Sequence, residues 1–290
     1  MAPIKLGIPK GSLEAATVDL FAQAGWAIQP RARNYFPAID DPDIACALVR
    51  AQEMGPYVAG GTLDAGLCGI DWILETEADV AVVADFLYSR SSDRPARWVL
   101  VVKQDSPVAS VADLQGAVIA TELVGYTRRY LAERGVDASV QFSWGATEAK
   151  VVEGLADAAV ELTETGSTIR AHGLRIVAEV LQTHTVLVAS HAAMADAWRR
   201  DKIEQVALLL RAALDARGKV VLKMNVPADR IDQVTALLPS LHAPTVAHLT
   251  DPAWLAVETV VDRARVRTLV PQLKAAGAEG ILELALNKIC

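Results

Sequence analysis

Short apolar runs that each lead through a small polar loop into a helical pattern recur along the first 216 residues of the chain. The first run occupies residues 4–8 and passes through the loop Pro9-Lys10-Gly11-Ser12 into a helical pattern over residues 13–24. Runs of this length are typical of buried strands, and strands that alternate with helices indicate an α/β fold. Because open α/β sheets bind ligands at the loops beyond their strand ends, we expect the functional residues in these loops.

The pattern changes after Gly218. Strand-like and helical segments then follow one another in the order βαββαβ, which is typical of a ferredoxin-like sandwich. The segments are residues 219–226 (β), 228–238 (α), 245–249 (β), 253–261 (β), 267–276 (α) and 280–286 (β). This part contains no nucleophile, metal-ligand spacing or phosphate loop. By analogy with other modules of this fold, we expect it to bind a regulatory ligand or copies of itself.

Composition argues against several classes of function. The chain has 290 residues, of which 52% are hydrophobic and 22% charged, and this supports two or three domains with sizeable cores. A net charge of −7 makes a general nucleic-acid surface an unfavourable hypothesis. The sequence shows no secretory leader and no apolar run of about 18–20 residues, so we expect no membrane span. The three cysteines form no metal-spaced pair and no disulfide framework, which favours a cytoplasmic location.

The most informative loop is Glu161-Leu162-Thr163-Glu164-Thr165-Gly166-Ser167-Thr168-Ile169. It lies between a strand-like run and a helical pattern, where glycine, free amides and the helix dipole favour a bound anion. The hydroxyls of Thr165, Ser167 and Thr168 can donate to phosphate oxygens. Glu161 and Glu164 suit ribose hydroxyls or a magnesium-bound substrate instead. The loop therefore indicates a phosphoribosyl site, although a capped helix start has the same composition and the loop alone does not decide between the two.

Other polar residues at strand ends are candidates for the same cleft. Lys10 could pair with a phosphate, although a loop lysine is more often simply solvated. Asp71 follows a buried run that ends in glycine, and capping of the next helix is its simpler role. The polar loop at residues 89–97, which carries three arginines, could be a basic lid over an anionic substrate or an exposed hairpin. In each case the structural interpretation is the simpler one.

Motifs for rival chemistries are absent from the sequence. The five histidines have no zinc-like spacing with a carboxylate, and there is no G-x-S-x-G elbow, P-loop or dinucleotide signature. We therefore expect the chemistry to depend on positioning and charge stabilisation, without a covalent nucleophile.

Taken together, these loops resemble those of the ATP phosphoribosyltransferases, in the long form of that family, which catalyse the first step of histidine biosynthesis. The matching segments are residues 154–175, 9–13, 69–72, 119–122 with 126–131, and, in the C-terminal part, 243–246 and 280–288. They occur in the family's order and cover essentially the whole chain. Three positions depart from the family pattern: Glu161 stands where aspartate is more usual, Ile169 where leucine is, and His172 where asparagine is.

The resemblance implies a fold and a division into domains. The fold is an α/β, bilobal catalytic core like the periplasmic binding proteins, followed by the ferredoxin-like domain. The first lobe would comprise residues 1–95 and 180–215, the second lobe residues 96–179, and the regulatory domain residues 216–290. Histidine would bind between regulatory domains as an allosteric inhibitor, within a homo-oligomer that ranges from dimer to hexamer.

The resemblance also implies a reaction. Adenine N1 of ATP would attack the anomeric carbon of phosphoribosyl pyrophosphate and release pyrophosphate, with Mg²⁺ held mainly through substrate phosphates. Catalytic roles would fall to Glu161, Glu164 and Lys10. The residues expected to bind phosphoribosyl pyrophosphate are Thr165, Gly166, Ser167, Thr168, Ile169, Gly11 and Ser12. The residues expected, with less specific support, to line the cleft for ATP are Arg33, Asp71, Thr121, Glu122 and Arg128. The sequence leaves one alternative open, a bilobal protein that binds or senses a small molecule without catalysis.

Overall fold

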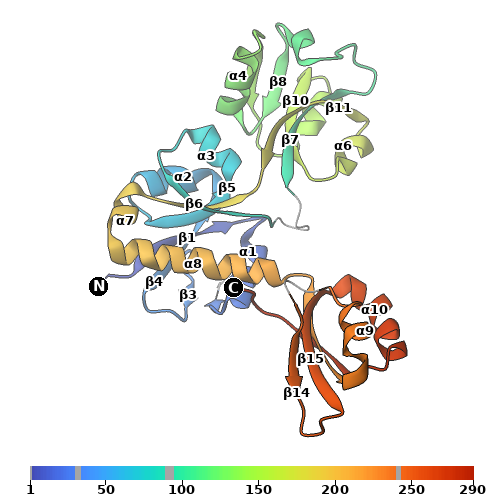
Figure 1. Cartoon of the computed structure of the whole chain (residues 1–290). Coiled ribbons are helices and arrows are strands. Elements are labelled where there is room, and N and C mark those ends of the chain that lie inside the picture. Colours follow the sequence, from blue (N-terminus) through green and yellow to red (C-terminus); the bar gives the residue numbers. More distant parts are fainter. Residues whose placement is uncertain (1, 30–33, 89–94, 240–242) are drawn as a thin grey trace. The chain divides into compact units, whose positions relative to one another are not determined.

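The computed structural model describes residues 2–29, 34–88, 95–239 and 243–290. The chain forms two compact units, one of residues 1–22 and 26–207 and the other of residues 23–25 and 208–290. The first unit contains two five-stranded sheets and a two-stranded ribbon, and the second contains a four-stranded sheet (Figure 1). The α/β class predicted from the sequence is confirmed.

The first sheet and the helices beside it form the first lobe. Its strands lie in the order β4-β1-β5-β12-β6, in which β1 is parallel to β4 and β5, and β12 is antiparallel to β5 and β6. The strands are β1 (Ile4–Lys10), β4 (Ile44–Arg50), β5 (Ala65–Gly69), β6 (Ala81–Phe86) and β12 (Thr185–Ala189). The helices that begin in this part of the chain are α1 (Glu14–Ala24), α2 (Ala51–Ala59), α3 (Ile70–Thr76), α7 (His191–Ala195) and α8 (Ala197–Ala216), and β2 (Ile28–Gln29) pairs with β3 (Ala38–Ile39) as the ribbon.

Two glycines allow a helix to approach this sheet closely. Gly7 on β1 and Gly66 on β5 are paired in register. A Cβ atom at either position would come within 2.3 Å of the sulfur of Met54 on α2. Met54 is fully buried, so its side chain packs directly against the bare backbone of the two central strands.

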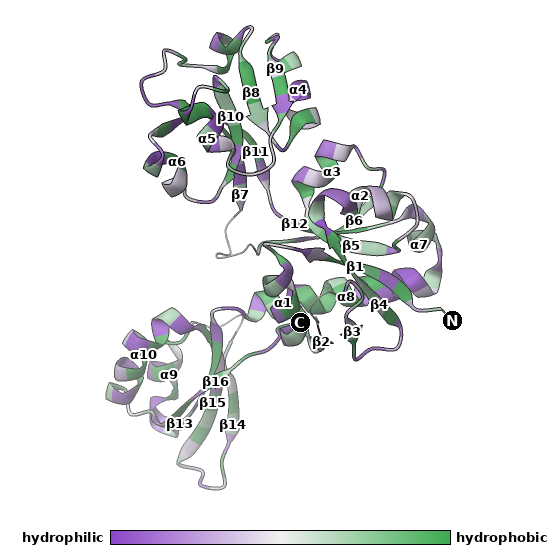
Figure 2. Cartoon of the chain, turned by 180° about the vertical axis from the view of Figure 1, so that it is seen from behind, coloured by the Kyte–Doolittle hydropathy of each residue, from purple (hydrophilic) through white to green (hydrophobic). Residues whose placement is uncertain are grey.

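The second sheet and its helices form the second lobe. Its strands lie in the order β11-β7-β10-β8-β9, in which β10, β8 and β9 are parallel and β7 is antiparallel to β10 and β11. The strands are β7 (Ala96–Lys103), β8 (Val118–Thr121), β9 (Ser139–Phe142), β10 (Ala158–Thr163) and β11 (Leu174–Thr183). The helices are η1 (Val111–Leu114), α4 (Val124–Ala132), α5 (Thr147–Val152) and α6 (Ser167–Ala171). Separate apolar clusters cover the two faces of β7, and the short strand β8 is largely coloured as hydrophobic in Figure 2.

The chain passes between the two sheets twice. It leaves the first sheet after β6 and returns to it through β11 and β12, so the second lobe is an insertion between two neighbouring strands of the first. Strand β11 continues in the second sheet to Thr183, past the lobe boundary that the resemblance placed after residue 179.

The C-terminal unit is the predicted ferredoxin-like sandwich. Its strands lie in the order β14-β15-β13-β16, all antiparallel. The elements are β13 (Lys219–Pro227), η2 (Ala228–Arg230), α9 (Ile231–Thr235), β14 (Thr245–His248), β15 (Trp254–Asp262), α10 (Arg263–Ala275) and β16 (Glu279–Ala285). Alternate residues of β13 and β15 are buried, as expected for a sheet covered on one face by helices.

One predicted helix is wrong in its extent. The sequence pattern indicated a single helix from Met194 to Ala216, whereas the structure breaks it at Asp196 into α7 and α8. The Asp196 backbone is extended, and its carboxylate accepts a hydrogen bond from the Arg199 amide at 2.9 Å, which satisfies the first turn of α8. None of the described helices is long and apolar enough to span a lipid bilayer.

Candidate active site

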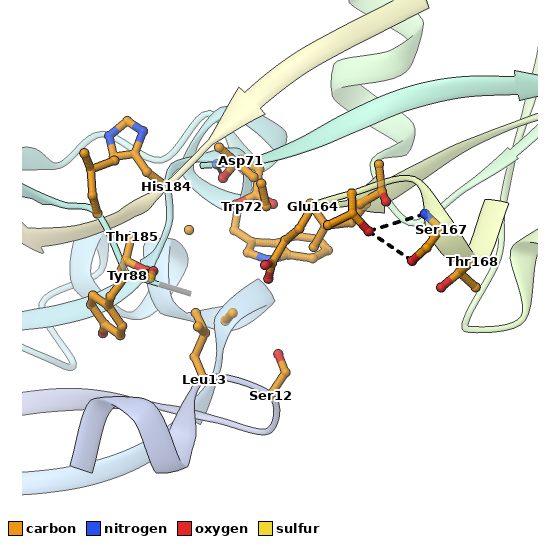
Figure 3. Close-up of a pocket in the computed structure, with 18 residues that line it drawn as sticks. Ser12, Leu13, Asp71, Trp72, Tyr88, Glu164, Ser167, Thr168, His184 and Thr185 are labelled. Atoms are coloured by element: carbon orange, nitrogen blue, oxygen red, sulfur yellow. Dashed lines mark hydrogen bonds between the residues drawn. The ribbon is translucent and has the colours of Figure 1, made fainter. Parts of the chain in front are cut away.

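A cavity of about 680 Å³ within the first unit is lined by residues of both lobes (Figure 3). From the first lobe and the crossing segments come Ser12, Leu13, Ala51, Gly69, Asp71, Trp72, Leu87, Tyr88, Thr183, His184 and Thr185. From the second lobe come Ala96, Leu162, Thr163, Glu164, Thr165, Ser167 and Thr168. The cavity therefore collects the ends of β1, β5 and β10, where an α/β protein is expected to bind its ligand.

The loop after β10 presents its hydroxyl groups to this cavity. Thr165 Oγ1 lies 3.0 Å from Ser167 Oγ. Figure 3 shows Glu164, Ser167 and Thr168 together on the second-lobe side of the cavity. The Gly166 amide donates to Thr163 Oγ1 at 2.8 Å, and Gly166 adopts φ 72°, a left-handed conformation that glycine tolerates. The loop is thus held in shape by its own hydrogen bonds, and Thr165, Ser167 and Thr168 remain exposed, as the sequence predicted for a phosphate cradle.

The Ile169 side chain does not take part in that cradle. It is 4% exposed and packs with Val99, Val101 and Leu174 in the core behind the loop. The sequence placed Ile169 among the phosphate-binding residues, but the structure gives its side chain a packing role because α6 must be anchored to the sheet.

Asp71 is a buried carboxylate in the cavity wall. It is 3% exposed, and its Oδ2 accepts a hydrogen bond from Trp98 Nε1 of the second lobe at 2.7 Å. Its Oδ1 has no hydrogen-bond partner among the described residues. Burial raises the pKa of Asp71, and this effect outweighs the hydrogen bond from Trp98, which lowers it. Glycine at position 69 leaves room for this carboxylate, since a Cβ there would lie 2.0 Å from Asp71 Oδ1 and would displace it.

The prediction that Asp71 caps a helix is wrong. The N-cap of α3 is Gly69, and no side chain caps that helix. The Asp71 side chain reaches across to the second lobe, and the rings of Trp72 and Trp98 meet edge to face beside it with centroids 6.2 Å apart.

Glu161 belongs to a group of carboxylates on the second lobe and is not among the described residues that line the cavity. The pKa of Glu161 is raised to about 7, chiefly by burial and also by the negative charges of Glu148 and Glu122, while a hydrogen bond from Thr147 lowers it. Glu122 itself has a raised pKa because it is partly buried, although it accepts bonds from the Gly145 amide and the Gln52 side chain. Glu164, by contrast, lies in the cavity wall.

The first loop enters the cavity through Ser12 and Leu13. Gly11 adopts φ 108°, and its amide lies 3.4 Å from Glu14 Oε2. Lys10 is exposed, with Nζ 3.9 Å above the centre of the Tyr35 ring.

Three of the described ATP-side candidates, Thr121, Glu122 and Arg128, are not among the residues that line the cavity. Thr121 is fully buried, and its hydroxyl donates to the Val160 carbonyl at 2.9 Å, so it holds β8 to β10. Arg128 donates to the Val140 carbonyl of β9 at 3.0 Å. Arg33 lies outside the described residues, as do Arg90 and Arg94 of the loop considered as a basic lid.

The sequence did not single out the residues where the chain crosses between lobes. Tyr88, Thr183 and Thr185 are buried and line the cavity, and His184 Nε2 lies 2.8 Å from Asp85 Oδ1. The only available signal was their position at the end of β6 and between β11 and β12. Among the residues described, no group of three or more histidine, cysteine, aspartate or glutamate side chains is arranged to hold a metal ion.

Comparison with known proteins supports the same assignment for the whole chain. The family model described as ATP phosphoribosyltransferase matches residues 50–212, and that of the HisG C-terminal domain matches residues 216–288. The chain is 60% identical to the ATP phosphoribosyltransferase of Desulfatibacillum aliphaticivorans over 99% of its length and 98% of the relative's. It is 61% identical to that of Nitratidesulfovibrio vulgaris (strain Miyazaki F), with the same coverage.

Solved structures support the fold. The ATP phosphoribosyl transferase (HisG:HisZ) complex from Thermotoga maritima contains a chain that matches 73% of this one and 98% of its own length, with a TM-score of 0.63 and 26% identity. The predicted bilobal core and C-terminal domain are thereby confirmed. The chain belongs to the ATP phosphoribosyltransferase family of histidine biosynthesis and is an enzyme that transfers a phosphoribosyl group.

Proposed function

We propose that the cavity binds phosphoribosyl pyrophosphate and ATP together, and that the chain joins the anomeric carbon of the ribose to N1 of adenine. The observation that carries this proposal is the exposed hydroxyl loop at Thr165–Thr168, which shares one cavity with the buried Asp71 and the half-buried Trp72. A volume of about 680 Å³ lies in the range of known small-molecule sites, roughly 300–1,000 Å³.

The second lobe would hold the phosphoribosyl group. The hydroxyls of Thr165, Ser167 and Thr168 would donate to the 5-phosphate, with the backbone amides of Gly166 and Ile169. Glu164 would face the ribose hydroxyls as an acceptor. Glu161 would act on the same sugar once the substrate is bound.

The first lobe would hold ATP and the pyrophosphate. Asp71 Oδ1, which is buried without a partner in the cavity wall, supplies an acceptor for a substrate N–H group. Ser12, with the Gly11 amide and Lys10, would lie toward the pyrophosphate. Glu122 and Arg33 stay weaker candidates for the ATP side. Thr121 and Arg128 would support the site indirectly, through the backbone bonds that they make.

The chemistry would need no general base, because adenine N1 attacks through its lone pair and carries no proton. The bond from N1 to the anomeric carbon forms as the bond from that carbon to the pyrophosphate oxygen breaks, and the leaving group keeps the electron pair. Positive charge develops on the ribose while the old bond breaks and the new bond forms, so an ionised carboxylate near the sugar lowers the activation barrier of the transfer. Mutational losses of one such electrostatic contact are about 3–4 kcal/mol in other enzymes.

Family membership is consistent with a metal requirement, and we propose Mg²⁺ as the ion. The cavity offers carboxylate oxygens from Asp71 and Glu164, which are the ligands that Mg²⁺ prefers. Because the described residues form no metal-binding cluster of their own, the ion would arrive with the substrate phosphates. When bound, it would neutralise charge on the pyrophosphate.

Regulation and assembly belong to the same proposal. We propose that the lobes comprise residues 1–95 with 184–215 and residues 96–183, so that the boundary follows the end of β11. We also propose that residues 216–290 bind histidine as a feedback inhibitor, and that the chain forms a dimer to hexamer in the cytoplasm. A chain truncated after Arg217 should then keep turnover but lose inhibition by histidine, with circular dichroism to show that it is folded. Full inhibition of the folded truncated chain would place the effector elsewhere.

A direct assay tests the catalytic proposal. Purified protein is mixed with ATP, phosphoribosyl pyrophosphate and Mg²⁺, and product absorbance is followed with pyrophosphatase present to remove the released pyrophosphate. We expect turnover that requires all three components. Binding of both substrates without turnover, in an assay validated with a known enzyme, would support the non-catalytic alternative instead.

A further inference from the structure

The two lobes meet away from the cavity at the ends of two helices, α3 of the first lobe and α4 of the second. Helix α4 begins without a side-chain cap of its own, because its N-cap residue is Leu123. The cap comes from the other lobe. Glu75 on α3 accepts the Gly125 amide at 2.8 Å through Oε1 and the Tyr126 amide at 2.7 Å through Oε2. These are amide groups of the first turn, which have no partner within a helix.

The second contact runs in the opposite direction. Arg129 on α4 donates to the Leu74 carbonyl at the end of α3, and its Nη1 lies 3.3 Å from the Glu77 carboxylate. Glu77 is the C-cap of α3 and has φ 49°, a left-handed conformation that is uncommon for a residue with a side chain. Each helix thus supplies the charged group that satisfies the free backbone end of the other, and both charges have the sign that the helix dipole favours.

A glycine makes this approach possible. A Cβ atom at Gly125 would lie 3.2 Å from the Glu75 carbonyl oxygen and 3.3 Å from Glu75 Oε1. Gly125 has no left-handed backbone angle, so its torsion angles do not require glycine. The close contact with Glu75 is what disfavours a side chain at this position.

The same helix α3 connects this contact to the cavity. Its first turn carries Asp71 and Trp72, which line the cavity and meet Trp98 of the second lobe. Its last turn carries Leu74 and Glu75. Because α3 is a single short helix of 7 residues, a change in its spacing from α4 moves the cavity wall relative to the hydroxyl loop.

We propose that Glu75 and Arg129 are positioning residues that form an interlobe latch: they favour the lobe separation at which Asp71 and Trp72 face the loop at Thr165–Thr168. Neither residue lines the cavity. The latch acts on both substrates alike, since each is bound between the lobes. This inference rests on the proposed substrate site and adds the contact that sets its width.

Loss of the latch should change the kinetics differently from loss of a contact to one substrate, because it should raise KM for both substrates. If only a fraction of molecules has the binding-competent separation, the apparent affinity for each ligand falls by that fraction. Glu75→Ala and Arg129→Ala should therefore raise KM for ATP and for phosphoribosyl pyrophosphate by a common factor of about ten, the size expected for losing a capping interaction of about 1.4 kcal/mol. The kcat at saturation should stay within about twofold, because saturating substrates restore the bound arrangement.

The test compares full-length variants with a matched control. Glu179→Gln breaks an ion pair with Arg97 that is also 3.3 Å long but lies within the second lobe, and it should leave both KM values unchanged. Gly125→Ala should raise both KM values although alanine favours a helix more than glycine does. Glu75→Gln keeps the shape and one acceptor oxygen, so it should give a smaller rise in the same direction and carries the test if Glu75→Ala does not fold.

The double variant Glu75→Ala/Arg129→Ala gives a further check. Once one contact has released the lobes, loss of the second should add little, so the rise in KM should be clearly less than the product of the single effects. Unchanged KM values, or a rise for one substrate only, overturn the latch while wild-type turnover upholds the substrate site. A wild-type chain without turnover overturns the substrate site itself.

Discussion

The two lobes contribute to the cavity in opposite ways. The first lobe supplies a buried wall, in which Asp71 is 3% exposed and Trp72 packs against Trp98. The second lobe supplies an exposed loop, in which Thr165, Ser167 and Thr168 are bonded mainly within the loop itself. The difference indicates a division of labour, in which one wall gives shape and a low dielectric and the other gives hydrogen bonds to a charged group.

The largest expected effect comes from removing the hydroxyls of the exposed loop. The double variant Thr165→Val/Thr168→Val should lower kcat/KM for phosphoribosyl pyrophosphate by roughly 10²–10⁴-fold, since a hydrogen bond to a charged group contributes about 1.5–3 kcal/mol. The midpoint of thermal unfolding should change little because both side chains are exposed. Thr268→Val, an exposed position of the C-terminal unit, is the control. Unchanged kinetics of the double variant would mean that the loop only begins a helix and does not bind the phosphate.

A change in the buried wall should separate stability from function. Asp71→Asn keeps an acceptor for Trp98 but replaces the buried acceptor Oδ1 with a donor, so kcat/KM for ATP should fall by about 10–100-fold. The raised pKa of Asp71 shows that burial disfavours its charged form. Its contribution to stability is therefore lost as pH rises through that pKa, and Asp71→Asn should unfold at equal or higher denaturant concentration at neutral pH. Marked destabilisation together with normal ATP kinetics would contradict the assignment. Asp201→Asn, at an exposed position of α8, is the control.

The ionisation of Glu161 should appear in the pH dependence of kcat/KM. The pKa of Glu161 is raised to about 7, so in the free enzyme it ionises as pH rises through neutrality. If the ionised form acts on the ribose, kcat/KM for phosphoribosyl pyrophosphate should rise severalfold between about pH 6 and pH 8. Glu161→Gln should remove this rising limb of the profile of kcat/KM against pH.

A neighbouring substitution tests the cause of the shift. Glu148→Gln removes a negative charge beside Glu161, so the pKa of Glu161 should fall and the limb should move to lower pH. A limb that stays in place in both variants would mean that another group titrates. For stability the sign is opposite, because a raised carboxyl pKa means that stability is lost as pH rises through it.

The smallest functional effect is expected at Ile169. Ile169→Val removes one buried methyl group and should lower the free energy of unfolding by about 0.5–1.5 kcal/mol. The KM for phosphoribosyl pyrophosphate should change less than about twofold, because only the backbone of this residue faces the phosphate in our proposal. A large rise in KM without loss of stability would restore Ile169 as a direct contact.

Local patterns predicted most of the fold. Short, mainly apolar runs marked β1, β5 and β12. Glycines marked helix ends because few other residues adopt the left-handed conformation found at Gly135 and Gly277. The break at Asp196 was missed because the apolar periodicity continues across it, and only the cap formed with Arg199 shows where α8 begins.

The site was predicted less completely, for a physical reason. The hydroxyl loop carries its own signal, since phosphate binding needs particular residues next to one another. Glu161 and Ile169 belong to the same segment, but the register of β10 and the docking of α6 turn their side chains toward other neighbours. Tyr88 and Thr183 reach the cavity only because two distant crossings lie together, and a single sequence does not record such a contact.

The insertion of the second lobe has a consequence for how the chain is made. Strand β6 pairs only with β12 within its sheet, and β12 is synthesised after the whole second lobe. The second lobe, whose strands are all formed between Ala96 and Thr183, can fold as soon as it emerges, whereas the first sheet must wait for Ala189. We therefore expect the order of folding on the ribosome to reverse the order of the sequence, with the later lobe acting as the first stable body and the N-terminal strands β1, β4 and β5 held open until the chain returns.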